Sequence, residues 1–594
     1  MRLRYLILSV TSVLLFLDAC STGNIKEHEL TTSVSPSNAG TVSPENSFFE
    51  DGDSLTITAT PNEHWVFDQW EGDLTGSENP THLEVKQDVD VTAIFVERIY
   101  PLNLEISGDG TVSEQIVQQK SNEYPNGTLV ELTATPSDGW HFLEWSDDLN
   151  GSEPIQEIMI SGETNVRAKF GIDKVKTFGG SDGEEAVSID YTMDGGMVLA
   201  GRSSSNDGDF DGLKLGENFS YLLKLSPSGK KEWIKSFRGS DSYESATSVI
   251  QTSDGGYIFT GQTFPNDSGS EDIGQGEVII AKLTSNGTIE WSKTLLGNNQ
   301  DYPRQVVEMK NGDFIIVGHT ASTTGDFQDL YNGSMDGFIL KFSAGGDLKW
   351  IKKYGGSSID YIHSAALSDD GEIVVTGSTE SNDGDFENTK NSVDNIFAMK
   401  VSTDGNILWT NIFGRDSKNY SSPTSAVSIV TSSDGGFILS GNTTASDGDF
   451  NGVDNGFIKP YIIKLNSVGQ KEWVTVYEGD FSIMRPSQVI ETQDNGIVVT
   501  GLSNSNTEIY HPQIDFESRI IALKLTSTGS VDWFKTFNGS EDDYGFALTS
   551  TDQNSVIITG RSSSNDDIFT SLNKGLSDIF ILQIDDSGEL IPFE

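Results

Sequence analysis

The chain has 594 residues, with 89 acidic and 38 basic side chains and a formal net charge of −51. Such an excess of negative charge repels the phosphates of nucleic acids and of anionic lipids, so we expect no nucleic-acid partner and no docking on an anionic membrane surface. The charge indicates solubility in a salty medium or, alternatively, divalent-cation binding. Because the sequence contains one cysteine, an internal disulfide is excluded.

The chain begins with a short basic segment followed by an apolar one. Arg2 and Arg4 precede the apolar residues 5–17, which are too few and too close to the terminus for a comfortable membrane span. The next motif, Leu17-Asp18-Ala19-Cys20, resembles a bacterial lipobox, although its aspartate departs from the usual small or apolar residue. In that family the cysteine is diacylated and becomes the mature N-terminus. The alternative is an ordinary signal peptide with a chance cysteine.

The lipobox resemblance implies a lipoprotein with a signal peptide over 1–19, lipidation at Cys20 and a polar tether over 20–30. It also implies a location at the bacterial outer membrane, facing the cell surface, because Ser21 and not an aspartate follows the cysteine. We expect membrane contact through this lipid alone, since no later stretch approaches about 18 consecutive apolar residues.

Two related modules follow, and both alternate polar and apolar residues as β-strands do. The sequence L-T-I-T-A-T-P at 55–61 is matched by V-E-L-T-A-T-P at 130–136. Aromatic residues recur with equal spacing as Trp65, Phe67 and Trp70 in the first module and as Trp140, Phe142 and Trp145 in the second. These aromatics can form a sugar-stacking platform or fill a small core, and their repeated spacing favours the core.

The pattern L-T-A-T-P-x-x-G-W-x-F-x-x-W at 132–145 resembles the divergent internalin-B-type B-repeat family. Members of that family are small β-grasp-like modules of bacterial surface proteins. The resemblance implies two such modules, at 31–98 and at 99–172.

From residue 173 onward, a unit of about 60 residues repeats seven times. Its clearest signal is Asp-Gly-Gly followed by an apolar run and a closing glycine, as in D-G-G-F-I-L-S-G at 434–441. Asp-Gly between apolar runs supplies the positive φ of a tight hairpin turn, and consecutive apolar residues suit a strand covered on both faces. The closing glycines are Gly201, Gly261, Gly318, Gly377, Gly441, Gly501 and Gly560.

Each unit predicts four short antiparallel strands and no helix, which is typical of a β-propeller. A lysine marks the third strand and a tryptophan the fourth, except in the seventh unit, which has Gln583 and no tryptophan. The unit resembles the W-x-K-x-F-G-G-S…D-G-G-Y repeats of bacterial surface-lipoprotein propellers and, more distantly, quinoprotein blades. We therefore predict an all-β chain with a seven-bladed propeller over 173–594; the alternatives are six or eight blades.

One strand is left over before the first unit. The segment K-V-K-T-F at 174–178 matches the outer strands of later units, whereas the outer strand of the seventh unit, at 589–594, contains Pro592 and lacks the tryptophan. Proline removes a hydrogen-bond donor, and an open ring would expose strand edges. We predict that 174–178 pairs with the last blade, next to or in place of 589–594, so that both ends of the propeller meet.

Several units carry an acidic loop after the second strand. Oxygen ligands on a tightly turned backbone suit calcium, and N-D-G-D-F-D-G at 206–212 opens like an EF-type loop, although the match fails at its twelfth position. The alternative is that the carboxylates cap turns while the phenylalanine packs on the blade. The candidate calcium ligands are Asp207, Asp209, Asp211, Asp383, Asp385, Asp447, Asp449 and Asn451.

No catalytic constellation stands out in the sequence. The seven histidines show no metal-ligand spacing, and the chain lacks a G-x-S-x-G motif and a phosphate-binding glycine loop. The segment S-T-D-G-N-I-L-W at 402–409 resembles a sialidase Asp-box, which is structural in that family. We therefore assign no catalytic or cofactor-binding residues.

Two classes of function are compatible with these observations. The first hypothesis is a non-enzymatic surface lipoprotein whose propeller presents a binding face to a glycan, protein or matrix ligand. The second is a propeller enzyme, quinoprotein-like or glycoside-cleaving, in which one blade should carry unique polar residues aimed at the central channel. A purely architectural spacer is a third interpretation.

Overall fold

The computed structural model describes residues 25–594 except 118–123, 138–139, 214–217, 238–241, 266–275, 329–333, 388–394, 415–423, 451–457, 478–482, 505–517, 570–571 and 594. These residues form 42 strands, and their helices are five 3₁₀ turns of three residues each, so the all-β prediction is confirmed. The chain divides into two compact units, Met1–Ile172 and Asp173–Glu594. Among the described residues, no helix is long and apolar enough to cross a membrane.

The first module is a pair of sheets around one apolar core. One sheet has the strand order β3 (Ser47–Glu50), β1 (Glu27–Ser35), β7 (Val89–Glu97) and β5 (Trp65–Gly72), and the other has β2 (Gly40–Ser43), β4 (Ser54–Pro61) and β6 (Thr81–Glu84). Strands β1 and β7 run parallel, and the remaining pairs are antiparallel. Because β1 already starts at Glu27, the predicted tether over 20–30 is too long, and its last residues belong to the module.

The second module also has two sheets around one apolar core, but each has three strands. One sheet has the strand order β12 (Ile155–Ile160), β10 (Thr128–Pro136) and β9 (Gly110–Ile116). The other has the order β11 (Trp140–Asp147), β13 (Thr164–Ile172) and β8 (Leu102–Ser107). Trp70 and Trp145 are each 2% exposed, and their indole N–H groups donate to backbone carbonyls, which confirms the core interpretation. The β-grasp-like prediction is wrong, because a second sheet covers the core and no helix lies among the described residues of either module.

The described residues of 173–594 form seven sheets of mainly antiparallel strands, numbered here sheet 1 to sheet 7 in chain order. The strands of sheets 1 to 3 are β15 (Glu184–Tyr191), β16 (Met197–Ser203), β17 (Phe219–Leu225), β18 (Lys231–Phe237); β19 (Ser242–Gln251), β20 (Tyr257–Pro265), β21 (Glu277–Leu283), β22 (Ile289–Leu295); and β23 (Asp301–Glu308), β24 (Phe314–Thr320), β25 (Asp336–Phe342), β26 (Leu348–Tyr354). Those of sheets 4 to 6 are β27 (Asp360–Leu367), β28 (Ile373–Thr379), β29 (Asn395–Val401), β30 (Ile407–Phe413); β31 (Ser425–Thr431), β32 (Phe437–Thr443), β33 (Lys459–Leu465), β34 (Lys471–Val476); and β35 (Ile483–Glu491), β36 (Ile497–Asn504), β37 (Ser518–Leu525), β38 (Val531–Phe537). Sheet 7 contains β39 (Asp543–Ser550), β40 (Val556–Ser562) and β41 (Asp578–Ile584), with β14 (Val175–Phe178) and β42 (Leu590–Ile591) at its outer edge.

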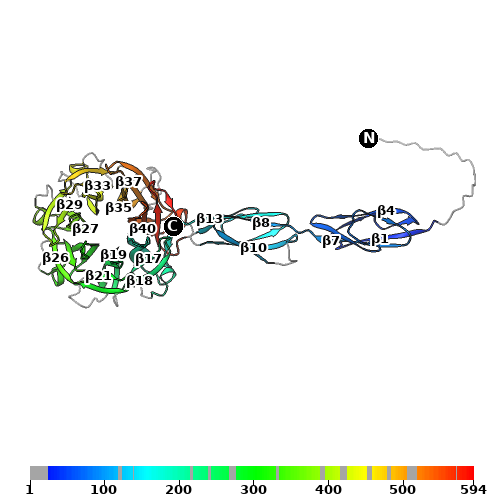
Figure 1. Cartoon of the computed structure of the whole chain (residues 1–594), viewed down its shortest axis with the longest axis horizontal. Coiled ribbons are helices and arrows are strands. Elements are labelled where there is room, and N and C mark those ends of the chain that lie inside the picture. The colour runs from blue at the N-terminus through cyan, green and yellow to red at the C-terminus, as the bar shows by residue number, and fades with distance from the viewer. Residues whose placement is uncertain are drawn as a thin grey trace, which may run out of the picture. The chain divides into compact units, whose positions relative to one another are not determined.

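These sheets are arranged around a common centre, with the first strand of each sheet innermost and the fourth at the rim, as β19, β27 and β35 against β18 and β26 show (Figure 1). The unit is therefore of the β-propeller type. The predicted hairpin turns are present, with Gly195 at φ 80° in the turn between β15 and β16. Such a backbone conformation favours glycine.

The second strand of each unit is buried on both faces, as its continuous apolar run predicted. In β16, Met197 and Leu199 face the apolar cluster shared with sheet 7, whereas Val198 and Ala200 belong to the cluster shared with sheet 2. Successive side chains of a strand point to opposite faces. A radial sheet between two neighbours therefore needs apolar residues at every position of this strand.

The lysine of the third strand pairs with the aspartate of the hairpin turn. In sheet 1 the buried Lys224 ammonium lies 3.0 Å from the Asp194 carboxylate. A Cβ on Gly196 would lie 2.5 Å from this ammonium, so the second glycine of Asp-Gly-Gly leaves room for the lysine. In sheet 7 the shorter Gln583 replaces the lysine and donates to the Ser555 hydroxyl at 2.6 Å, and Ser555 occupies the position of Gly196.

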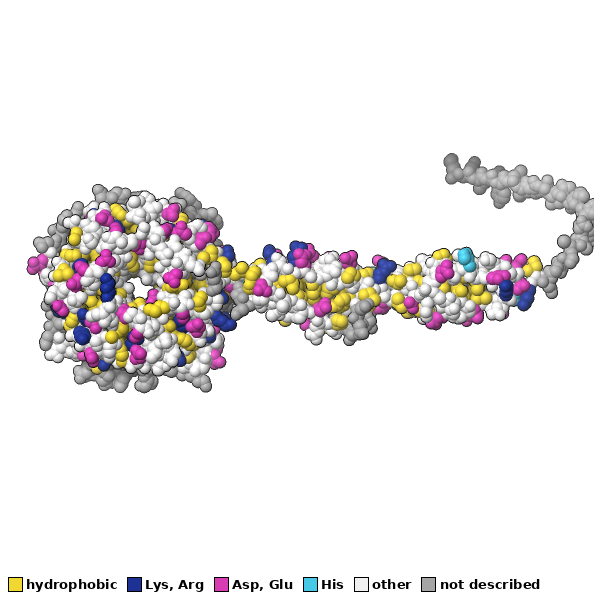
Figure 2. All heavy atoms as spheres, viewed as in Figure 1, with side chains coloured by type: hydrophobic (Ala, Val, Ile, Leu, Met, Phe, Trp, Pro, Cys, Tyr) yellow, Lys and Arg dark blue, Asp and Glu magenta, His cyan; other side chains and the backbone are white. Residues whose placement is uncertain are grey.

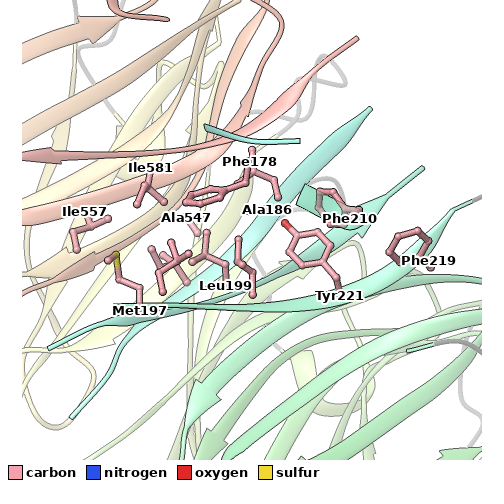
Figure 3. Close-up of a cluster of buried hydrophobic side chains, with 14 residues drawn as sticks. Phe178, Ala186, Met197, Leu199, Phe210, Phe219, Tyr221, Ala547, Ile557 and Ile581 are labelled. Carbon is pink, nitrogen blue, oxygen red and sulfur yellow. The ribbon is translucent and has the colours of Figure 1, made fainter. Parts of the chain in front are cut away.

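The outer edge of sheet 7 combines strands from both ends of the propeller sequence. Strand β14 pairs antiparallel with residues 579–582 of β41, and β42 pairs with the next two residues of the same edge, Gln583 and Ile584. The predicted closure of the ring is confirmed by this pairing. Phe178 of β14 is 7% exposed and packs in a cluster that includes Ala186 of sheet 1 and Ile581 of sheet 7 (Figure 3).

Deleting 173–178 should remove the cooperative unfolding of the propeller, because the edge of β41 and the cluster around Phe178 lose their cover. We expect a broader calorimetric transition at a lower temperature. Deletion of 589–594, which removes β42 and its two residue pairs with β41, is the matched control and should shift the transition less. An unchanged transition after deletion of 173–178 would show that the ring does not depend on β14.

Candidate functional site

The predicted acidic loops fold as short turns that hold the start of their own sheet. The Asp209 carboxylate accepts hydrogen bonds from the Gly179 N–H at 3.1 Å and from the Lys574 ammonium at 2.7 Å. Burial raises the pKa of Asp209, but the bond and charge of Lys574, together with the hydrogen bonds from Gly179 and Lys231, outweigh it, so this pKa lies below its usual value. The turns are η1 (Gly208–Phe210), η2 (Gly325–Phe327), η3 (Gly384–Phe386), η4 (Gly448–Phe450) and η5 (Asp567–Phe569), and each buries its phenylalanine.

The other candidate calcium ligands have similar neighbours. Backbone N–H groups donate to Asp207, Asp383, Asp385 and Asp449 at 2.7 to 3.0 Å, from Ser181, Ser357, Gly355 and Gly414 respectively. Asp447 lies in the same loop as Asp449, Asp211 is exposed, and Asn451 lies outside the described residues. These contacts are those of the turn-capping alternative. Across the described residues, no group of three or more His, Cys, Asp or Glu side chains is suited to a metal ion, and calcium binding stays a prediction.

A pocket of about 650 Å³ opens at one end of sheets 3 and 4. Tyr302 and Arg304 come from β23, His319 from β24, and Tyr361 and His363 from β27. Its lining also includes Gln300, Ser378, Thr379 and Glu380. Sequence reasoning assigned no function to any of these residues.

The pocket adjoins the central channel, where the propeller is hollow (Figure 2). A cavity of about 320 Å³ there is lined by residues of all seven innermost strands, and Arg304 and His363 border both this cavity and the pocket. The strand register shifts around Arg304 and around His363, so each occupies a β-bulge. A bulge inserts an unpaired residue and re-aims its side chain. The equivalent bulges of the other sheets hold Val187, Thr247, Val427, Ser487 and Phe546.

Buried carboxylates fix the strand starts that carry the tyrosines. Asp360 directly precedes Tyr361 and accepts hydrogen bonds from the Thr379 hydroxyl at 2.5 Å and the Ser381 hydroxyl at 2.8 Å. Asp301 precedes Tyr302 and accepts from Ser322 in the same way. Each acid ties the inner strand to the end of the second strand, so the following residue is presented at the channel mouth in a fixed position.

The aromatic and imidazole rings of the pocket pack against one another, with His319 edge to face on Tyr361 and His363 and tilted against Tyr302. The His319 ring lies 4.6 Å from the Tyr361 ring, 5.1 Å from Tyr302 and 6.0 Å from His363, measured between centroids. The Arg304 guanidinium carbon lies 6.0 Å from the Tyr302 centroid. His319 is 3% exposed, and its Nδ1 has no hydrogen-bond partner among the described residues. A buried polar atom of this kind is rare and often marks a functional site.

Both histidines are neutral at physiological pH. Burial, together with the charge of Arg304, lowers the pKa of His363 to about 3. Burial, Arg304 and His363 hold the pKa of His319 well below its usual range. Burial and then Glu380 raise the pKa of Tyr361, so its hydroxyl stays protonated. The pocket therefore offers neutral imidazoles and hydroxyls, which both donate and accept hydrogen bonds, beside a guanidinium that only donates.

The sequence did contain a signal for this site. His319 directly follows the closing glycine Gly318, where other units have residues such as Ser378 and Asn442, and Arg304 and His363 share one repeat position. Residues that differ from the repeat pattern at the same position of two consecutive units lie side by side when the units form a ring. Spacing along the chain conceals them, because the two histidines are 44 residues apart and lie on strands of different sheets.

Residues 30–98 and 100–174 match the family model of the divergent InlB B-repeat domain, and the resemblance stated for the two modules is confirmed. That match does not reach the propeller. No curated protein matches the chain.

Three solved structures similar to the chain have low identities. A protein of unknown function from Dyadobacter fermentans has 12% identity and a TM-score of 0.35 over 69% of this chain and 98% of that one. YCF48 bound to D1 peptide has 7% identity and a TM-score of 0.36, with 69% and 96% covered. A PL25 ulvan lyase bound to -[GlcA(1-4)Rha3S]- has 9% identity and a TM-score of 0.36, with 69% and 94% covered. None of these likenesses bears on what this chain binds.

The buried acids predict an unusual pH dependence of stability. Burial raises the pKa of Asp301 to about 6, above the value of about 4 in an unfolded chain. A carboxyl group whose pKa is raised by folding stabilises the fold below pH 4, and this contribution is lost as the pH rises through about 6. The unfolding temperature of the propeller should therefore rise when the pH falls from 7.5 to 5.

The matched variants are Asp301→Asn, which fixes a neutral side chain, and Asp404→Asn at an exposed position. We expect Asp301→Asn to reduce the increase in the free energy of unfolding between pH 7.5 and pH 5 by about 1–3 kcal/mol, because a shift of one pKa unit corresponds to about 1.4 kcal/mol. Asp404→Asn should leave this increase unchanged. Thermal unfolding across this pH range measures the effect. If the free energy of unfolding increased equally in Asp301→Asn and in the wild type, the raised pKa of Asp301 would not be a cause of this pH dependence.

Proposed function

We propose that 173–594 is a seven-bladed β-propeller that binds a saccharide in the pocket between sheets 3 and 4. The observation that carries the proposal is the pocket itself, in which Tyr302, Tyr361 and Arg304 surround two neutral imidazoles. Its volume of about 650 Å³ lies within the usual range for small-ligand sites.

The lining favours a hydroxyl-rich ligand over an apolar one. Tyrosine and imidazole rings provide apolar faces against which a sugar ring can pack, and their polar edges can bond hydroxyl groups. Gln300, Arg304 and Glu380 add an amide, a donor and an acceptor. An apolar ligand would bury these polar groups without partners, which costs free energy.

A glycan array with the whole protein tests this function first, and Arg304→Gln tests the site. We expect the variant to lose about 10- to 100-fold in affinity for the glycan found, because a charge-assisted hydrogen bond contributes about 1.5–3 kcal/mol. Lys349→Gln makes the same change of charge at an exposed position of β26 and should bind as the wild type does. Absence of any glycan binding, or equal affinity of Arg304→Gln and the wild type, would contradict the proposal.

A saccharide-cleaving enzyme is the second candidate, favoured by the closeness of His319, His363 and Tyr361. Groups that can give and take a proton within one pocket are the components of general acid–base catalysis. Chromatography of the bound glycan after prolonged incubation separates the two functions. Shorter products that disappear with His363→Ala identify an enzyme, and intact glycan identifies a binding protein.

We further propose that the protein is a lipoprotein of the bacterial outer membrane, anchored through Cys20. The support is the sequence motif at 17–20, which lies outside the described residues. In this arrangement the two B-repeat modules separate the anchor from the propeller along the chain.

Metabolic labelling with a fatty-acid probe tests the anchor. The wild type should incorporate the probe and fractionate with membranes, and Cys20→Ala should do neither. Cys20→Ser keeps the size of the side chain and serves as a second unlabelled variant. Equal labelling of the wild type and Cys20→Ala would rule out lipidation at this residue.

A further inference from the structure

A second cluster of polar and aromatic side chains lies at the channel mouth, on sheets 7 and 1. The Arg561 guanidinium carbon lies 4.4 Å from the Tyr544 ring centroid, and Tyr544 stacks on Phe546 at 5.9 Å with an interplanar angle of 16°. The Glu185 carboxylate lies 2.6 Å from the Arg202 guanidinium and 3.7 Å from that of Arg561. Two guanidinium groups thus contact one carboxylate, and the formal charges of Glu185, Arg202 and Arg561 sum to +1.

This cluster occupies the position that the pocket occupies in sheets 3 and 4. Tyr544 opposite Arg561 repeats the strand register of Tyr302 opposite His319. In sheet 1 this register position is occupied by Glu185 opposite Arg202. In sheet 6 Arg485 occupies the position of Tyr544 on the first strand. These equal positions place the cluster and the pocket at the same end of the propeller.

The two sites are connected through the channel. Phe546 occupies the bulge of sheet 7, as Arg304 and His363 do in sheets 3 and 4, and all three line the same central cavity. Phe546 leads to Tyr544 and then to Arg561 by ring stacking and cation–π contact. The Arg561 Nε is buried and has no hydrogen-bond partner in the part of the chain that the structure describes. Its guanidinium therefore keeps donor capacity beyond the contact with Glu185.

Positive charge at this place is notable in a chain of net charge −51. A guanidinium recognises planar carboxylate and sulfate groups through paired hydrogen bonds. A positive mouth within an otherwise acidic surface attracts an anion to this place and repels it from the rest of the surface.

We propose that this cluster is a second subsite and that the ligand is an acidic polysaccharide, whose chain crosses the channel mouth with a carboxylate or sulfate group on Arg561. The inference rests on the proposed saccharide function of the pocket. It specifies that the saccharide is negatively charged. It also specifies that the saccharide is longer than one sugar unit, because one sugar cannot occupy both sites.

The test uses the whole protein and three probes: oligogalacturonate, its fully methyl-esterified form and chondroitin-sulfate oligosaccharides. Esterification removes the carboxylate charge and keeps the sugar chain. Calorimetric titration at low salt should show at least 10-fold tighter binding of an acidic probe than of the ester. Tighter binding of the uronate or of the sulfated probe identifies the acidic group.

Arg561→Gln should lose about 10-fold in affinity for the acidic probe and little for the ester, whereas Lys349→Gln should change neither. Arg202→Gln, which also lowers the positive charge of the cluster, should reproduce the selective loss and guards against a folding defect of one variant. Equal binding of acid and ester, or an equal loss for both in Arg561→Gln, overturns the inference. If neutral glycans bind and depend on Arg304 but not on Arg561, the proposed function stands and the inference fails. If no glycan of any kind binds, both fail.

Discussion

Closure of the ring by β14 on β41 is the contact on which the propeller depends. A radial sheet has two apolar faces, so each sheet needs a neighbour on both sides. Sheets 2 to 6 lie between the sheets of the preceding and following repeats. Sheets 1 and 7 come from opposite ends of the repeat array, and the strand that precedes sheet 1 in the chain, β14, belongs to sheet 7. Phe178 belongs to this strand and packs in the cluster that joins those two sheets. A channel lined by seven inner strands exists only while this seam is closed.

The residues that hold each sheet in place are separate from the residues that line the site, so the site can differ between sheets while the fold stays the same. Turn aspartates, buried acids at the inner-strand starts and apolar second strands recur from unit to unit and hold each sheet in place. The bulge residue of each inner strand lines the channel, and Tyr302 and Tyr361, which follow buried acids, line the pocket. Seven sheets thus offer equivalent variable positions, and tyrosine, arginine and histidine in sheets 3 and 4 form one pocket.

Much of the architecture could be predicted from the sequence because it repeats. The period, the Asp-Gly turns and the unmatched strand at 174–178 led to a propeller closed by its two ends. The β-grasp-like expectation came from the family resemblance, and the alternating strand pattern could not correct it, because such a pattern does not reveal whether a helix or a second sheet covers the apolar face. The pocket was missed because its members come from different units, and periodic features drew attention to the acidic loops, whose carboxylates bind backbone N–H groups instead.

The large negative charge and the arginines at the mouth have complementary effects on an acidic ligand. Salt screens exposed charges over about 8 Å at physiological ionic strength, so the outer acidic groups act on a ligand mainly near their own part of the surface. There they disfavour binding of a polyanion. Arg561 and Arg202 lie at the mouth, where both contact the single carboxylate of Glu185. For the proposed ligand, selectivity for this site therefore arises as much from repulsion elsewhere as from attraction at the channel, and it does not require a strongly basic pocket.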